Sequence, residues 1–233
     1  MSEQARQFWA GVRAEFPLLV GVFPFGMIYG ALALNAGLSK SASQMMSSIV
    51  FAGSAQFITT QLVHDATPGL VIVLTIAIVN LRHVLYSASL APYLASVSTR
   101  WKTLLAYLLT DEAYAPTIIK YEQDGATTYS HWFLFGAGIA LWTNWQISTA
   151  LGIFLGTAIP ESWSLDFALP LTFIAMVVPA LKNRPAIAAA LSAGMTALVA
   201  YSLPYKLGLI LAALVGIAIG TFLEGRQSPK GIS

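Results

Sequence analysis

The sequence predicts an all-α, polytopic integral membrane protein with about eight transmembrane helices, at least one of which is broken. Of its 233 residues, 57% are hydrophobic and only 9% are charged, whereas an average soluble domain carries about 25% charged residues. A bilayer core is crossed by roughly 20 apolar helical residues, and stretches of this kind recur along the chain. This composition excludes a soluble enzyme, a disordered chain and a nucleic-acid binder.

Eight stretches are expected to span the membrane, and they are expected to be helices because a spanning backbone must satisfy its own hydrogen bonds. In order they are residues 16–36, 43–63, 69–97, 103–119, 132–159, 167–181, 185–203 and 207–223. Stretch 43–63 is rich in Ser, Thr, Gln and Gly, so a re-entrant segment is the alternative there. Residues 1–233 are expected to form a single transmembrane permease domain, with 1–15 as a cytoplasmic N-terminal segment and 224–233 as a flexible cytoplasmic tail.

The distribution of basic residues predicts that both termini are cytoplasmic. With eight spans, the cytoplasmic side would hold Arg6, Arg13, Lys120, Lys182, Arg184, Arg226 and Lys230. The opposite side would hold Lys40, Arg100, Lys102 and Lys206. This bias agrees with the excess of Lys and Arg in cytoplasmic loops. If stretch 43–63 is re-entrant, the bias nearly vanishes, so eight spans are preferred.

Small residues four apart on three of the stretches predict close helix packing. The pairs are Gly26/Gly30, Gly152/Gly156 and Gly216/Gly220. Packing within the chain is the simpler interpretation, and a subunit interface is the alternative.

Four ionisable residues lie inside the predicted spans, where each costs about 2.5–3.5 kcal/mol to insert. Arg82 and His83 lie mid-way along 69–97, a stretch about 43 Å long as one helix and therefore longer than the bilayer core. We expect the helix to break near Asn80, so that its polar groups line a substrate site as in many transporters. The alternative is that Arg82 snorkels to an interface while Asn80 caps a helix.

Asp111 and Glu112 are expected near the middle of a helix over 103–119. One carboxylate should pair with Arg82. The other could carry a proton, because burial favours the protonated form of a carboxyl group, and we assign proton coupling to Asp111, Glu112 and His83. A purely structural ion pair is the alternative.

A third feature is the run of small residues at 52–55, followed by Gln56. Unwound backbone there could bind the ammonium or carboxylate of an amino acid, although helix packing alone also explains the pattern. We predict substrate binding by Gly53, Ser54, Gln56, Asn80 and Arg82. The absence of cysteine and the scattered histidines predict no metal site and no cofactor, and a single acidic pair does not suggest an enzyme.

Several segments, in this order, resemble the AzlC family, the large subunits of bacterial branched-chain amino acid exporters. They are residues 25–33 (FGMIYGALA), 36–39 (AGLS), 51–57 (FAGSAQF), 80–83 (NLRH), 85–92 (LYSASLAP) and 108–112 (LLTDE). The resemblance covers residues 16–121 strongly and the remainder by hydropathy. It implies export of leucine, isoleucine and valine, with methionine as a further candidate, across a bacterial cytoplasmic membrane. It also implies a small AzlD-type membrane subunit and coupling to the proton gradient.

Other functions remain open on the sequence. An uncoupled amino-acid channel or facilitator would not need a titrating carboxylate. A membrane assembly subunit would transport nothing. The residue assignments above come from physical argument and are not carried over from the family.

Overall fold

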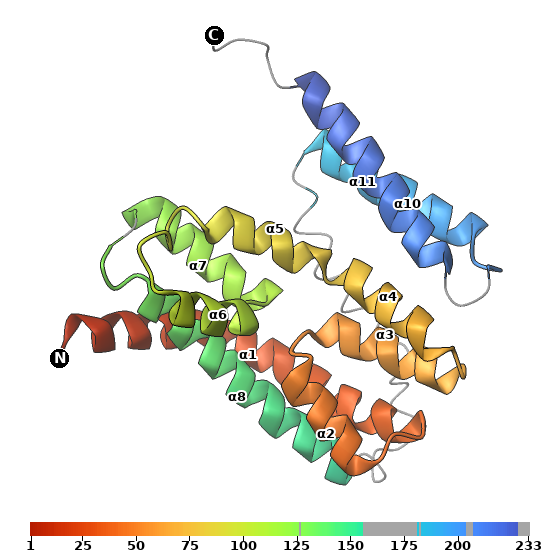
Figure 1. The fold of residues 1–233 in the computed structure, drawn as a ribbon, viewed down its shortest axis with the longest axis horizontal. Coiled ribbons are helices and arrows are strands. Elements are labelled where there is room, and N and C mark those ends of the chain that lie inside the picture. The colour runs from red at the N-terminus through yellow and green to blue at the C-terminus, as the bar shows by residue number, and fades with distance from the viewer. Residues whose placement is uncertain (126, 156–180, 182, 204–206, 228–233) are drawn as a thin grey trace. The chain divides into compact units, whose positions relative to one another are not determined.

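The computed structural model describes residues 1–125, 127–155, 181, 183–203 and 207–227, and every regular element within these ranges is a helix. The chain divides into two compact units, Met1–Pro160 and Glu161–Ser233. Figure 1 shows the helices of each unit. In the first unit they are α1 (Glu3–Asn35), α2 (Lys40–Ile49), α3 (Gly53–His64), α4 (Gly69–Val79), α5 (Leu81–Leu90), α6 (Thr99–Leu108), α7 (Asp111–Asp124) and α8 (His131–Leu155). In the second they are α10 (Arg184–Val199) and α11 (Leu207–Gln227).

The central contact of the first unit is a seam between α1 and α8, in which glycines bring the two backbones together. A Cβ added to Gly30 would lie 2.8 Å from the Ile153 nitrogen, and one added to Gly152 would lie 2.7 Å from the Met27 carbonyl carbon. A Cβ on Gly26 would lie 2.8 Å from the Ser148 Cβ. These contacts confirm the predicted close packing through Gly26 and Gly30. Gly156 lies outside the described residues.

The predicted single helix over 43–63 is wrong, because the structure divides it into α2 and α3. The backbone leaves the helical conformation between them, at Val50 (φ −104°, ψ 74°) and at Ala52 (φ −153°, ψ 98°). The polar composition of the stretch is the physical reason, since side chains replace the backbone hydrogen bonds that the break removes. The alternative of a re-entrant segment stays open.

The predicted break near Asn80 is confirmed. α4 ends at Val79 and α5 begins at Leu81, and the two follow one another along nearly the same line (Figure 1). The interruption is mild, because Asn80 keeps helical dihedral angles (φ −84°, ψ −1°). α5 then ends at Leu90 rather than at Val97 as the sequence suggested.

The predicted helix over 103–119 is also wrong. α6 ends at Leu108, Leu109 is extended, and Thr110 caps a new helix with its side chain accepting the Ala113 N–H. Asp111 therefore begins α7 instead of lying mid-helix. A threonine cap followed by acidic residues is a favoured helix start, because carboxylates in the first turn complement the positive end of the helix dipole.

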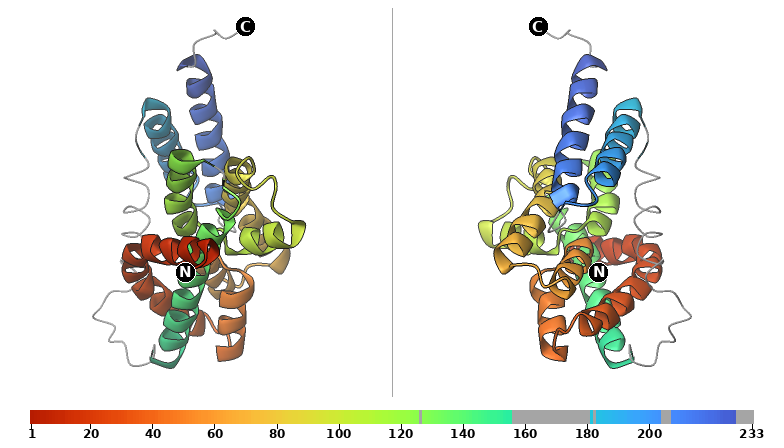
Figure 2. Two further views of the ribbon diagram at one scale, coloured as in Figure 1. Left: turned by 90° about the vertical axis from the view of Figure 1, so that its left-hand side faces the viewer. Right: turned by 90° about the vertical axis from the view of Figure 1, so that its right-hand side faces the viewer.

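In the second unit, α10 and α11 run side by side (Figure 2). A Cβ added to Gly216 would lie 3.0 Å from the Ala193 Cβ, and one added to Gly220 would lie 3.1 Å from the Ala189 Cβ. The third predicted glycine pair is thus a helix contact within the chain. The predicted stretch 167–181, apart from its last residue, lies outside the described residues.

The structure describes residues 1–15 and 224–227 of the two predicted terminal segments, and their cytoplasmic location stays a prediction. α1 begins at Glu3, so residues 3–15 continue the first predicted span as one helix. α11 continues to Gln227 beyond the predicted span end at Leu223, and residues 228–233 lie outside the described part. The expectation of one domain over residues 1–233 stays a prediction.

Two helical stretches of the described chain are long and apolar enough to cross a membrane. They are α1 and the α4–α5 stretch Gly69–Leu90. The second also exposes a row of large apolar side chains, as a lipid-facing helix does: Leu70, Val73, Leu74, Leu81, Val84 and Leu85. The number of membrane spans expected from the sequence, eight, stays a prediction.

Candidate functional site

An ion pair between α5 and α7 lies at the centre of the candidate site. The Arg82 Nη1 atom lies 2.5 Å from the Asp111 Oδ2 atom, and the two side chains are 26% and 17% exposed. Arg82 Nη2 also donates to the Ser54 hydroxyl at 2.5 Å. This geometry confirms that one carboxylate of the acidic pair lies within salt-bridge reach of Arg82, and it brings three predicted site residues together.

Tyr86 is a second partner of Asp111, and it was not among the residues predicted for the site. Its hydroxyl donates to Asp111 Oδ1 at 2.5 Å. Its ring stacks on that of Tyr114 with centroids 4.5 Å apart, and the Tyr114 hydroxyl hydrogen-bonds Ser89. Tyr86 follows Arg82 by four residues, so both side chains lie on one face of α5. This four-residue spacing is the sequence feature from which a role for Tyr86 beside Arg82 could have been predicted.

Polar atoms without partners cluster at the α4–α5 junction. Asn80 Oδ1, Arg82 Nε and His83 Nε2 are buried and have no hydrogen-bond partner within the described part of the chain. His83 uses its other ring nitrogen, Nδ1, toward the Asn80 carbonyl at 3.2 Å. Buried polar groups are normally hydrogen-bonded. Three unpaired atoms on neighbouring residues therefore mark a place where a polar ligand or water would bind.

Gln56 and Gly53 lie at the α2–α3 junction, where their surroundings are packed. Gln56 is fully buried, its Nε2 donates to the Val50 carbonyl at 2.6 Å, and its Oε1 accepts from Trp145 Nε1 at 3.0 Å. A Cβ on Gly53 would lie 3.1 Å from the Trp145 ring. The structure thus does not place the Gln56 amide with the unpaired atoms near Arg82, and its predicted role in substrate binding stays a prediction.

Glu112 lies next to Asp111 in the first turn of α7 and has no ion pair among the described contacts. Thr110 caps the same turn. Glu15 is another carboxyl group and lies on α1, a helix that contacts α7. Glu15 was assigned from the sequence to a peripheral segment, but its side chain is 0% exposed.

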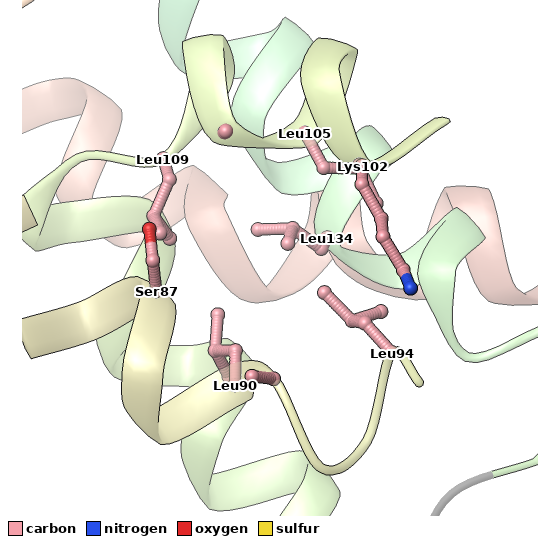
Figure 3. Close-up of a pocket in the computed structure, with 9 residues that line it drawn as sticks. Ser87, Leu90, Leu94, Lys102, Leu105, Leu109 and Leu134 are labelled. Carbon is pink, nitrogen blue, oxygen red and sulfur yellow. The ribbon is translucent and has the colours of Figure 1, made fainter. Parts of the chain in front are cut away.

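A largely apolar cavity of about 230 Å³ lies between α5, α6 and α8 (Figure 3). Leu90, Leu94, Leu105, Leu109 and Leu134 surround it. Two of its lining residues are near the polar residues in sequence: Ser87 follows His83 by one helical turn, and Leu109 precedes Asp111 by two positions. Within the described ranges, no group of three or more His, Asp or Glu side chains could hold a metal ion.

Comparison with known proteins places these features in a family. The sequence model of the family described as AzlC protein matches residues 17–159, which is more than half of the chain. This range includes the ion pair, its tyrosines and the cavity. No solved structure matches the chain.

Individual relatives match over most of their length. Inner membrane protein YgaZ of Escherichia coli is 26% identical over 91% of this chain and 87% of its own. An uncharacterized membrane protein of Archaeoglobus fulgidus is 29% identical over 91% of this chain and 94% of its own. The branched-chain amino acid transport protein AzlC of Bacillus subtilis is 25% identical over 74% of this chain and 68% of its own.

Proposed function

The chain belongs to the AzlC family, a family of transporters and not of enzymes, and we propose that it exports branched-chain amino acids in exchange for protons. The expected substrates are leucine, isoleucine and valine, with methionine as a further candidate. Two observations support the proposal: the unpaired buried atoms on Asn80, Arg82 and His83, and a largely apolar cavity that is lined in part by the same helix, α5.

The polar cluster offers the groups that recognise a free amino acid. Arg82 Nε is a donor suited to a carboxylate, and Asn80 Oδ1 is an acceptor suited to an ammonium group. His83 Nε2 can serve either end, depending on its tautomer. Because Arg82 is held by Asp111 and Ser54, its remaining N–H is presented in a fixed orientation. Preorganisation of this kind reduces the entropy lost on binding.

The cavity accounts for selection of aliphatic side chains. A volume of about 230 Å³ holds several water molecules, each of which occupies about 30 Å³ in the liquid. A branched four-carbon side chain therefore fits. The lining is mostly leucine, with Lys102 and Ser87 as its polar members. It therefore favours an aliphatic side chain over a charged or strongly polar one, which would lose much of its hydration there.

Proton coupling is assigned to Asp111, Glu112 and His83. Asp111 is neutralised by Arg82, so Glu112 is the carboxyl of the pair that is free to change its protonation during transport. His83 lies in the first turn of α5 next to Arg82. A substrate carboxylate that competes for Arg82 would weaken the ion pair, and this competition would link substrate binding to the protonation of the acidic pair.

We also propose how the chain is arranged in the membrane. We expect about eight spans in a bacterial cytoplasmic membrane, with both termini cytoplasmic. We also expect a small AzlD-type subunit to bind the chain. The exposed apolar row on α4 and α5 is available to lipid or to that subunit.

Efflux from proteoliposomes tests the proposal. The chain is reconstituted with and without the small subunit, the vesicles are loaded with labelled leucine, and efflux is followed with equal and unequal pH across the membrane. We expect efflux that an inward proton gradient accelerates. Efflux that ignores the gradient would indicate an uncoupled facilitator. No efflux in either preparation, from folded protein, would contradict transport by this chain.

A further inference from the structure

The cavity between α5, α6 and α8 has a buried floor and an open side. Its floor consists of buried leucine side chains: Leu90, Leu94, Leu105, Leu109 and Leu134. Its open side is formed by the exposed lining residues, which are Ser87, Ala91, Lys102 and Ala106. Three of these four side chains are small, so Lys102 is the long and charged member of the lining.

The cavity has two distinct ends. Figure 3 shows Ser87 and Leu109 at one end, and Lys102 and Leu94 at the other. The first end is the one near the Arg82–Asp111 ion pair, because Ser87 follows Arg82 by five positions on α5 and Leu109 precedes Asp111 by two. From Ser87 to Leu94 the chain advances by seven residues, which is about 10 Å of helix. Lys102 therefore lies at the end of the cavity that is farther from the ion pair.

The Lys102 side chain is held at this far end by a hydrogen bond. Its Nζ atom donates to the Ala95 carbonyl at 2.9 Å, and Ala95 follows the floor residue Leu94. The side chain thus reaches from α6 to the segment that follows α5. A carbonyl group is neutral, so this contact fixes the position of the ammonium group without cancelling its charge.

A fixed positive charge at the far end affects which side chains fit. An amino acid whose carboxylate and ammonium groups bind near Arg82 would extend its side chain along the cavity toward Lys102. A leucine side chain is short and uncharged, and it would lie among the floor leucines. A lysine or arginine side chain would bring its own positive charge toward that of Lys102, and like charges repel strongly where water is partly excluded.

We infer that Lys102 is a specificity-determining residue, whose ammonium group excludes amino acids with a cationic side chain from the cavity. This inference rests on the proposed function and adds to it a residue that was outside the predicted site. The floor leucines alone disfavour any charged side chain through lost hydration. Lys102 adds a discrimination by sign, which acts against cations in particular.

The test compares norleucine with lysine, which have the same carbon chain and differ in the terminal ammonium group. Each is used to inhibit exchange of labelled leucine by full-length wild type, Lys102→Met, which keeps the length of the side chain, and Lys102→Glu. Inhibition by lysine relative to norleucine should strengthen about tenfold in Lys102→Met, the scale of one unit charge several ångströms away. It should strengthen further in Lys102→Glu. Arg100→Met and Arg100→Glu are the controls, because Arg100 is exposed on α6 and does not line the cavity.

Three results would overturn the inference. The first is an unchanged ratio of lysine to norleucine inhibition in folded Lys102→Glu. The second is an equal change in Arg100→Glu, which would show a general effect of surface charge. The third is loss of leucine exchange in folded Lys102→Met, because Lys102 would then bind the substrate instead of selecting against cations.

Thiol labelling tests the charge in the cavity without transport. The chain contains no cysteine, so Ala106→Cys places a single thiol on the open side, one turn from Lys102. Its rates with an anionic and a cationic methanethiosulfonate reagent are compared with Lys102 intact and in combination with Lys102→Met or Lys102→Glu. The preference for the anionic reagent should fall severalfold at each step, and an unchanged preference would overturn the inference. If the preference falls as expected but wild type exchanges no leucine, the proposed function fails while the charge at the cavity stands.

Discussion

Two junctions between consecutive helices differ in whether their polar groups are hydrogen-bonded. At the α2–α3 junction, the Gln56 amide bonds the Val50 carbonyl and Trp145. At the α4–α5 junction, Asn80, Arg82 and His83 each keep a buried polar atom without a partner in the described structure. A satisfied network rigidifies a fold, whereas an unsatisfied one costs free energy. The first junction therefore behaves as scaffold, and the second as a binding site.

The largest expected effect comes from the scaffold. In Gly30→Leu, the new side chain would enter the backbone of α8 near Ile153, and we expect a loss of about 3 kcal/mol or more of stability. Gly21→Leu is the matched control on the same helix, because a Cβ there meets nothing within 4 Å. Thermal unfolding and membrane abundance check the prediction. Equal stability of the two variants would show that the seam is not a structural requirement.

Arg82→Lys should abolish transport with a smaller cost in stability. An ammonium cannot reproduce the contacts of the guanidinium with Asp111 and Ser54 while offering a third donor to the substrate. Hydrogen bonds to charged groups contribute about 1.5–3 kcal/mol, which sets the expected destabilisation. Leucine exchange, normalised to folded protein, is the measurement. Normal exchange by Arg82→Lys would place the substrate elsewhere.

Gln56→Leu should show the opposite pattern. It leaves the Trp145 N–H unpaired and removes one of the two hydrogen bonds that the Val50 carbonyl accepts, the other coming from the Ala52 N–H. An unsatisfied buried group costs about 1–3 kcal/mol. Exchange by the protein that remains folded should stay near the wild-type rate. A selective loss of exchange at unchanged stability would restore the sequence-based assignment of Gln56 to substrate binding.

Tyr86→Phe has the smallest expected effect. It removes one hydrogen bond to Asp111 and leaves the Arg82 ion pair and the stacked ring in place. A single hydrogen bond contributes about 0.5–1.5 kcal/mol. We expect a slightly lower unfolding temperature and a moderate change in gradient-driven efflux. A complete loss of efflux would show that the hydroxyl has a direct role.

The sequence predicted the features that depend on local composition. Glycine spacing predicted that the first span packs closely on another helix, which the structure identifies as α8. The cost of a lone charge in lipid predicted the pairing of Arg82 with a carboxylate. Recognition of the family was also confirmed. Helix ends were less well predicted, because hydropathy does not register caps. Thr110 followed by Asp111 and Glu112 is a helix start that hydropathy alone read as mid-helix.

The features that could not be predicted from the sequence depend on contacts between segments that are distant along the chain. Glu15 follows Arg13 by two positions in a charged N-terminal stretch, so the sequence alone suggests a surface residue. Only the packing of α1 on α7 and α8 reveals its burial. The sequence suggests that the Gln56 amide binds a ligand. In the structure the amide instead bonds the Val50 carbonyl at the helix break. No periodicity in the sequence distinguishes these cases.

Ligand-induced stabilisation measures the difference between the two junctions most directly. A ligand at about 100 times its Kd stabilises a protein by about 2.7 kcal/mol. The unfolding temperature is therefore recorded with and without saturating leucine for wild type, Gln56→Leu and Arg82→Gln. Leucine should raise it in wild type and in Gln56→Leu, and leave it unchanged in Arg82→Gln. An undiminished shift in Arg82→Gln, together with a lost shift in Gln56→Leu, would contradict the assignment of the α4–α5 junction as the substrate site.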